Sequence, residues 1–200
     1  MQRSVFDIAD DLLKLSGQSS LESLKLQKLT FYAYGWYAHL TGRPLFDQQF
    51  YAMQRGPVVG ELLTAHSGEK HCDKSMLLRG KRVLEERAVP SDPFYDDVLQ
   101  AVGSYYVQFS SFELVDMTHE EEVWVSAWSS RPLSSNRGDL PASKIITYFA
   151  SKREIPADLK SKMPDSELIQ ATPDEFVRLE SLPKTRFVAL SDRFRELSLI

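Results

Sequence analysis

Residues 24–40 are too apolar to form a surface helix. At 3.6 residues per turn one side of this segment is a continuous apolar stripe, and most of the opposite side is apolar too. The residues concerned are Leu24, Leu26, Leu29, Phe31, Ala33, Gly35, Trp36, Ala38 and Leu40. A helix that is apolar nearly all round belongs inside a domain. We therefore expect a central buried helix, with the rest of the chain wrapped around it.

The polar residues of this segment crowd its first two turns. They are Lys25, Gln27, Lys28 and Thr30. Because polar side chains usually face water, this clustering predicts that the amino-terminal end of the central helix is its solvated end.

The composition indicates one soluble domain. With 200 residues, of which 42% are hydrophobic, the chain is long enough to bury a substantial core. Its net charge of −4 comes without a basic tract, so nucleic acid is not the expected ligand. A single cysteine, Cys72, excludes an internal disulfide and fits a reducing compartment. With neither a signal peptide nor an apolar membrane span in sight, we expect a cytoplasmic protein without membrane contact.

Capping residues and apolar spacing predict a mainly helical chain. Further helices are expected at residues 5–16, 57–66, 93–109, 111–118, 120–128, 141–150, 173–182 and 187–199. The β structure should be small, with a short strand near residues 50–53 and a hairpin within 76–89 that turns at Gly80. Residues 66–74 and 129–140 read as loops.

These elements predict a mainly α fold: a compact helical domain around the central buried helix, at about residues 24–41. It carries a small β-hairpin or short strands and a C-terminal helical appendage. Prolines cut the last fifty residues into short pieces. We therefore expect a domain at residues 1–150 and an appendage at 151–200 that packs on the core or on a partner.

The sequence shows no phosphate-binding glycine loop, dinucleotide fingerprint or nucleophile elbow. A zinc site would have to combine His66, Glu69, His71 and Cys72, and the adjacent pair at 71 and 72 is awkward for one metal. A solvated loop is the favoured interpretation there, and a loop cysteine without a catalytic role is favoured for Cys72. We expect no metal and no cofactor.

His119 precedes three glutamates and could serve as a general base with one of them. The favoured alternative is a helix junction, in which Thr118 caps and His119 bonds a buried carbonyl. The pattern is not HExxH, since residue 123 is Val, so zinc-protease chemistry is excluded.

Aromatic residues beside an arginine are typical of protein–protein hot spots. Tyr34 and Tyr37 have hydroxyls that need partners when buried, so one or both could reach a surface groove. Arg55 is the best-placed arginine, although an ion pair with Asp47 or Glu61 would explain it equally well.

Several motifs together resemble one known family. They are Lys25-Leu26-Gln27-Lys28-Leu29, Tyr32-Ala33, Gly35-Trp36-Tyr37, residues 41–47, Arg55-Gly56-Pro57-Val58-Val59 with Glu61-Leu62, residues 114–124, and Ala142-Ser143 with Ile145, Tyr148 and Phe149. This pattern over residues 5–150 resembles the Panacea domain, the SocA-like antitoxin family that is often labelled phage-associated. Met53 stands where the family commonly has tryptophan, and Val123 replaces its usual proline.

The resemblance implies an antitoxin of a toxin–antitoxin system, with no enzymatic activity. Members neutralise their toxins by direct protein–protein binding, and one acts as an adaptor that delivers its toxin to a protease. The expected partner is a cognate protein toxin encoded by an adjacent gene. In the adaptor alternative a protease is an additional partner. A hydrolase using His119 and Glu120 is the remaining alternative. The candidate contact residues are Tyr34, Tyr37, Met53, Arg55, Glu61, Phe187 and Phe194.

Overall fold

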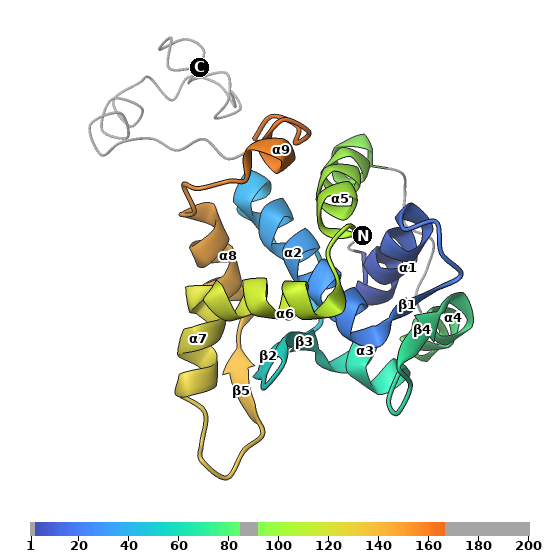
Figure 1. Ribbon diagram of the computed structural model, residues 1–200, viewed down its shortest axis with the longest axis vertical. Helices are drawn as coiled ribbons and strands as arrows, with labels where there is room; N and C mark the ends of the chain where they lie inside the picture. Colours follow the sequence, from blue (N-terminus) through green and yellow to red (C-terminus); the bar gives the residue numbers. More distant parts are fainter. Residues whose placement is uncertain (1–2, 85–91, 167–200) are drawn as a thin grey trace, which may run out of the picture. The chain divides into compact units, whose positions relative to one another are not determined.

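A long helix, α2 (Ser23–Thr41), runs through the middle of the protein. The computed structural model describes residues 3–84 and 92–166. Within them α2 contacts α1, α5, α6 and α8, which surround it in Figure 1. Trp36, Tyr32 and Tyr34 of this helix are among the largest fully buried side chains. The predicted central helix and the mainly α fold class are therefore confirmed.

The other elements are short. The remaining helices are α1 (Val5–Leu15), α3 (Gly60–Ala65), α4 (Lys74–Val83), α5 (Pro93–Tyr106), α6 (Ser111–Glu120), α7 (Glu122–Ser129), α8 (Ala142–Ala150) and α9 (Ala157–Lys160). The strands are β1 (Ser20–Glu22), β2 (Phe50–Met53), β3 (Gly56–Val59), β4 (His71–Asp73) and β5 (Arg137–Leu140). None of the helices in the described part of the chain is long and apolar enough to cross a membrane.

Local caps explain several helix starts. Ser4 and Asp7 form a capping box at the start of α1, and Ser110 and Glu113 form another at α6. The Asp92 side chain accepts from Tyr95 N–H at the start of α5, with proline at the first helical position. These helices begin where their caps predicted.

Two antiparallel sheets attach to α2. β1 pairs with β4, and β2 lies between β3 and β5. The β2–β3 hairpin pairs Met53 with Gly56, so residues 54–55 form its two-residue turn. On the other side of β2, Met53 pairs with Arg137. Residues from two distant parts of the chain are thereby brought to the same end of the sheet.

The prediction that a helix begins at Pro57 is wrong. Pro57 lies in β3 opposite Ala52, and helix α3 begins only at Gly60. Ala52 and Pro57 form a non-hydrogen-bonded pair of the antiparallel ladder, in which the backbone groups of Pro57 point away from β2. Proline is tolerated there because the ladder requires no N–H from this residue. The predicted loops at residues 66–74 and 129–140 are also partly wrong, since they contain β4 and β5.

The hairpin predicted within residues 76–89 is wrong over its described part. Residues 74–83 form α4. Its N-cap is Asp73, whose side chain accepts a hydrogen bond from the Met76 N–H over 2.9 Å. Gly80 lies within α4 and not in a turn. It allows the Phe6 ring to pack closely against the helix, since a Cβ at residue 80 would lie 2.3 Å from that ring. Residues 85–89 lie outside the described residues, as do the helices expected at 173–182 and 187–199.

The predicted solvation of the amino-terminal end of α2 is wrong as well. Gln27, Lys28 and Thr30 are at most 1% exposed. The Thr30 hydroxyl donates a hydrogen bond to the Leu26 carbonyl, while the side chains of Gln27 and Lys28 form hydrogen bonds with β3. Buried polar groups need such partners, and those of Gln27 and Lys28 lie about thirty residues further along the chain.

Contacts divide the chain into one unit of residues 1–165 and another of residues 166–200. In the first unit, Leu159 of α9 is fully buried and belongs to the main core cluster. Ile155 and Met163 pack against the same cluster.

Candidate functional site

The side chain of Gln27 acts as a pairing partner for the outer edge of β3. Val59 donates its N–H to Gln27 Oε1 over 2.8 Å, and Gln27 Nε2 lies 3.4 Å from the Val59 carbonyl, to which it donates. The same amide nitrogen is 3.0 Å from His66 Nε2. Because burial lowers the pKa of His66, its neutral ring is suited to accept this bond. The network fastens β3 to α2 inside the protein.

Lys28 binds the same strand one residue further along α2. Its side chain is fully buried, and its Nζ donates to the Pro57 carbonyl over 2.7 Å. Burial lowers the pKa of Lys28 to about 7, because the ammonium loses its hydration. In a strand the N–H and C=O of one residue point the same way. Proline therefore presents only an acceptor to the lysine, where another residue would add a competing donor.

Gly56 allows this close approach. Its φ is +93°, a backbone conformation that side chains disfavour. A Cβ at residue 56 would lie 2.5 Å from Thr118 Oγ1 and 2.8 Å from Lys28 Nζ. The Gly56-Pro57 pair thus fits a site where α2 and α6 meet the hairpin.

Two aromatic rings hold the turn from the other side. Trp124 of α7 donates its indole N–H to the Met53 carbonyl over 3.2 Å. His119 stacks on Trp124, with ring centroids 4.1 Å apart. Burial and the nearby Lys28 charge lower the pKa of His119, while the Gln54 backbone acts in the opposite direction. The aromatic pair therefore anchors the β2–β3 turn.

Motif residues from four elements thus converge on the β2–β3 hairpin, which carries a two-residue turn. The converging residues are Gln27, Lys28, Gly56, Pro57, Thr118, His119 and Trp124. The turn residues themselves, Gln54 and Arg55, remain exposed. A buried polar network that holds an exposed turn is a way to present that turn in one fixed position.

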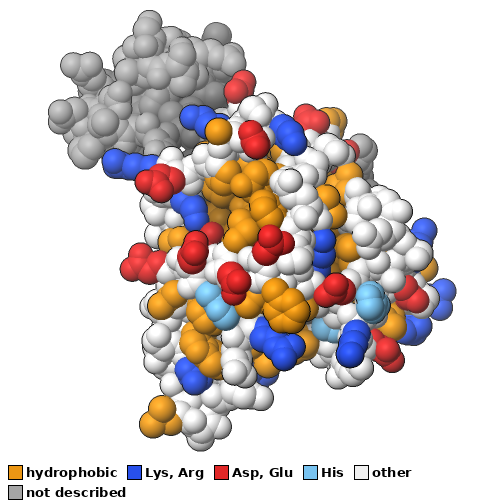
Figure 2. All heavy atoms as spheres, viewed as in Figure 1, with side chains coloured by type: hydrophobic (Ala, Val, Ile, Leu, Met, Phe, Trp, Pro, Cys, Tyr) orange, Lys and Arg blue, Asp and Glu red, His pale blue; other side chains and the backbone are white. Residues whose placement is uncertain are grey.

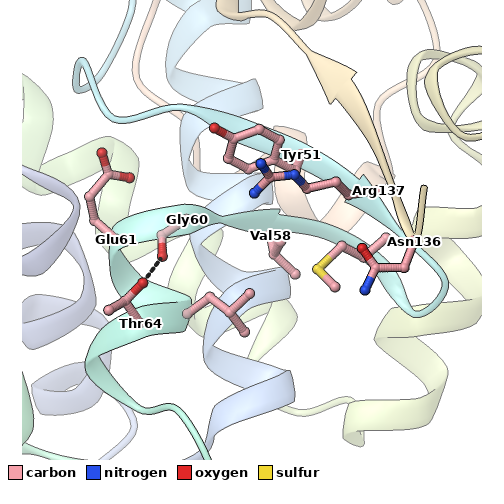
Figure 3. A pocket seen from close by; sticks show the side chains of 9 residues that line it. Tyr51, Val58, Gly60, Glu61, Thr64, Asn136 and Arg137 are labelled. Carbon is pink, nitrogen blue, oxygen red and sulfur yellow. Dashed lines mark hydrogen bonds between the residues drawn. The ribbon is translucent and has the colours of Figure 1, made fainter. Parts of the chain in front are cut away.

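A surface groove of about 480 Å³ adjoins the turn. It is lined by Tyr51, Met53, Val58, Gly60, Glu61, Leu63, Thr64, Asn136 and Arg137. Figure 3 shows the Arg137 side chain lying along Tyr51, and its guanidinium carbon is 4.6 Å from the ring centroid. Glu61 and Thr64 come from α3, where the Thr64 hydroxyl donates to the Gly60 carbonyl over 2.9 Å. The groove lining thus combines an aromatic ring, a cation and a carboxylate.

The predicted contact residues fall in different environments. Met53 and Glu61 line the groove, and Arg55 lies at the adjacent turn. Within the described residues, Arg55 forms no ion pair with Asp47 or Glu61. Three of the seven candidates therefore gather around the turn and its groove.

The other four candidates do not join them. Tyr34 is fully buried between Phe46 and Phe50 and offers no surface, because its aromatic neighbours enclose it. Tyr37 is half-buried against Phe94. The two remaining candidates, Phe187 and Phe194, lie outside the described residues.

The sequence reasoning missed Tyr51 and Arg137. The alternating burial of β2 leaves Tyr51 and Met53 on its outer face, and that alternation was a usable signal for Tyr51. Arg137 carried none, because its position depends on the pairing of β5 with a strand more than eighty residues earlier.

The residues of this arrangement fall within a match to a known family model. The model for the Antitoxin SocA-like, Panacea domain matches residues 26–125, half of the chain. The chain belongs to the SocA-like Panacea antitoxin family. Comparisons with curated proteins and with solved structures found no match. Every residue that converges on the β2–β3 turn lies within the matched range, which is narrower than the range of 5–150 over which the motifs resemble the family.

The two departures from the Panacea pattern sit near the turn. Met53 is half-buried and lines the groove, so its side chain forms part of the groove surface. Val123 is 7% exposed and lies in the first turn of α7. Helix α7 forms with valine there, and Trp124 still reaches the Met53 carbonyl.

Membership of an antitoxin family suggests a non-enzymatic role. Glu121 accepts hydrogen bonds from Tyr148 and Lys152 rather than from His119. Cys72, interpreted from the sequence as a loop residue, is buried in β4, and burial raises the pKa of its thiol to about 11. A buried thiol with a raised pKa is a poor nucleophile. Within residues 3–84 and 92–166, no three His, Cys, Asp or Glu side chains are grouped to hold a metal.

Replacing Gln27 tests the attachment of β3. We expect Gln27→Leu to lower the free energy of unfolding by about 2 kcal/mol, because Val59 N–H and C=O would lose their buried partners. Urea unfolding followed by circular dichroism would measure this loss. Gln100→Leu, at an exposed position on α5, is the matched control and should change stability by less than about 0.5 kcal/mol. Equal stability of both variants would contradict the assigned role.

Proposed function

We propose that this protein is an antitoxin that neutralises a cognate protein toxin, encoded by a neighbouring gene, by binding it directly. The observation that carries this proposal is its membership of the SocA-like Panacea antitoxin family. The position of the motif residues supports it, because they hold an exposed turn beside a groove of mixed chemistry. Covering or distorting the active site of a toxin requires a shaped surface of this kind and no catalytic group.

We place the toxin-binding surface at the β2–β3 turn and the adjoining groove. Arginine and tyrosine are enriched among residues that dominate protein–protein binding energies, and this surface presents Arg55, Arg137 and Tyr51. Glu61 and Met53 supply a carboxylate and a flexible apolar contact.

Co-expression with the adjacent small open reading frame tests the function. We expect the neighbour alone to arrest growth, and this protein to restore growth and to co-purify with it. Restored growth with protease-dependent loss of the neighbour would favour the adaptor alternative. A harmless neighbour that does not co-purify would contradict the antitoxin proposal.

Arg55→Ala tests the surface. We expect binding to the toxin to weaken by about tenfold, the effect of losing about 1.4 kcal/mol of contact energy. Folding should be unchanged, because Arg55 is exposed and forms no ion pair with the described carboxylates. Arg79→Ala, at an exposed position on α4, is the matched control. Identical affinities of the two variants in a titration calorimeter would place the toxin elsewhere on the protein.

A further inference from the structure

The loop that joins α7 to β5, residues 130–136, extends beyond the ends of both elements (Figure 1). Its last residue, Asn136, lines the groove beside the β2–β3 turn, together with Arg137 at the start of β5. The loop is therefore continuous with the surface at which we place the toxin. Figure 2 shows hydrophobic surface at this end of the molecule, and residues 130–136 contain no acidic residue.

Leu133 is at the tip of this loop, and its side chain is fully exposed. The Ser135 N–H donates to the Pro132 carbonyl over 2.9 Å, so residues 132–135 form a turn in which Leu133 is the first central residue. No other large apolar side chain in the described part of the chain is as exposed. Single exposed apolar residues are common on proteins, so the case for Leu133 depends on how its loop is held.

Stacking and a hydrogen bond fix the start of the loop. The guanidinium carbon of Arg131 lies 3.5 Å from the Trp128 ring centroid, and its Nη1 donates to the Trp128 carbonyl over 2.7 Å. Trp128 in turn stacks on Trp124, with centroids 6.1 Å apart and planes inclined by 10°. Because Trp124 also binds the Met53 carbonyl, the loop and the β2–β3 turn are both attached to α7.

The end of the loop is fixed as well. The Ser135 hydroxyl donates to the Arg137 carbonyl over 2.7 Å and accepts from the Arg137 N–H over 3.2 Å. Gly138 of β5 then packs so closely on α7 that a Cβ there would lie 2.2 Å from the Ala127 carbonyl oxygen. A loop that is fixed at both ends loses little further conformational freedom when a partner binds.

A fully exposed leucine gains free energy when it enters an apolar pocket, because its surface leaves water. A second copy of this protein is a poor host for it. Four hollows on the described part of the protein are each lined by at least one carboxylate and one cationic side chain. A leucine that entered them would remove water from charged groups, which is unfavourable. A different protein is therefore the better host.

We propose that Leu133 enters an apolar pocket of the partner protein, so that the α7–β5 loop extends the binding surface beyond the β2–β3 turn. This step rests on the proposed antitoxin function. The loop contributes one apolar anchor in a fixed position, and the adjoining groove contributes the polar contacts beside it.

Leu133→Ser is the main test, because it removes the apolar anchor and leaves a residue that is common in turns. We expect this variant to bind the toxin encoded by the adjacent gene about tenfold more weakly than the wild type. Val83→Ser is the matched control and should bind like the wild type, since it removes an 81% exposed valine from the last residue of α4. Both variants should melt at the wild-type temperature, because neither side chain is buried.

Calorimetric titration gives the three affinities. Equal binding by the Leu133 and Val83 variants would overturn the proposal and leave the antitoxin function intact. If the wild type itself does not bind the toxin, both the proposal and the antitoxin function fail.

Arg131→Ala tests whether the fixed loop positions Leu133. This variant should bind the toxin more weakly, because the loop loses its stacking and its hydrogen bond to the Trp128 carbonyl. Leu133→Ser should then have a smaller effect in the Arg131→Ala background than in the wild type, since a loop that is free to move no longer presents residue 133 in one place. Fully additive effects would overturn the idea of a positioned anchor.

Sedimentation of the protein alone tests the other host. We expect the wild type and Leu133→Ser to sediment identically over a range of concentrations. A wild-type dimer that dissociates in the Leu133→Ser variant would assign Leu133 to self-association and overturn the proposal.

Discussion

We expect Gly56→Ala to lower the free energy of unfolding by about 4 kcal/mol and to abolish toxin neutralisation. The φ of +93° costs a side chain about 1–3 kcal/mol. The new Cβ would also stand 2.5 Å from Thr118 Oγ1 and 2.8 Å from Lys28 Nζ, and relieving such overpacking costs about 1–3 kcal/mol more. Because the same atoms hold the β2–β3 turn, its exposed residues would be displaced together with the backbone.

Gly68→Ala is the matched control for this variant. Gly68 also has a positive φ, of +83°, but a Cβ there meets nothing within 4 Å. We therefore expect it to show the backbone cost alone, about 1 kcal/mol, with neutralisation retained. Chemical unfolding gives the energies, and growth during toxin co-expression gives the function. A Gly56 variant no less stable than the Gly68 variant would mean that Lys28 and Thr118 can move aside freely.

Local patterns predicted the helical frame well. The apolar periodicity of residues 24–40 identified the central helix, because a segment without a polar face has only the interior to occupy. Ser4 with Asp7 and Ser110 with Glu113 satisfy N–H groups within a few residues of themselves. Such caps can be read from the sequence, since both partners lie in the same short stretch.

Polar residues with distant partners could not be assigned in this way. Gln27 and Lys28 look like solvent-facing residues, but their partners Val59 and Pro57 lie about thirty residues away. The same applies to β1 and β4, which are three residues each and exist because they pair with one another. Elements this short have almost no propensity signal of their own.

The candidate site was predictable only where its residues lie close together in the sequence. Met53, Arg55 and Glu61 follow one another closely around the hairpin, so their common surface could be anticipated. Arg137 reaches that surface only through the pairing of β5 with β2. Tyr34 was a plausible contact residue because tyrosine is common at interfaces, but Phe46 and Phe50 enclose it. The spacing and number of the aromatic residues in α2 do not reveal which of them faces inward.

The buried amine of Lys28 makes a second large prediction, on the dependence of stability on pH. Its folded pKa is about 7, against an ordinary value of 10.5 for an unfolded lysine. Between these values the unfolded chain binds a proton that the folded protein does not, so stability must rise with pH. Below pH 7 both states are protonated and this contribution is flat. From pH 7 to pH 9 the wild type should gain about 2 kcal/mol relative to Lys28→Met.

Urea unfolding of the wild type and of Lys28→Met at intervals of half a pH unit measures this difference. Titration of the buried tyrosines, whose pKa values are raised by burial, affects both proteins alike and cancels in the subtraction. Lys160→Met, at an exposed position on α9, is the control, and its curve should run parallel to that of the wild type. A flat difference for Lys28→Met would mean that the folded protein keeps this amine charged. In that case the Pro57 carbonyl and the surrounding dipoles would stabilise an ammonium inside the core, and Lys28 would hold the hairpin as a buried cation.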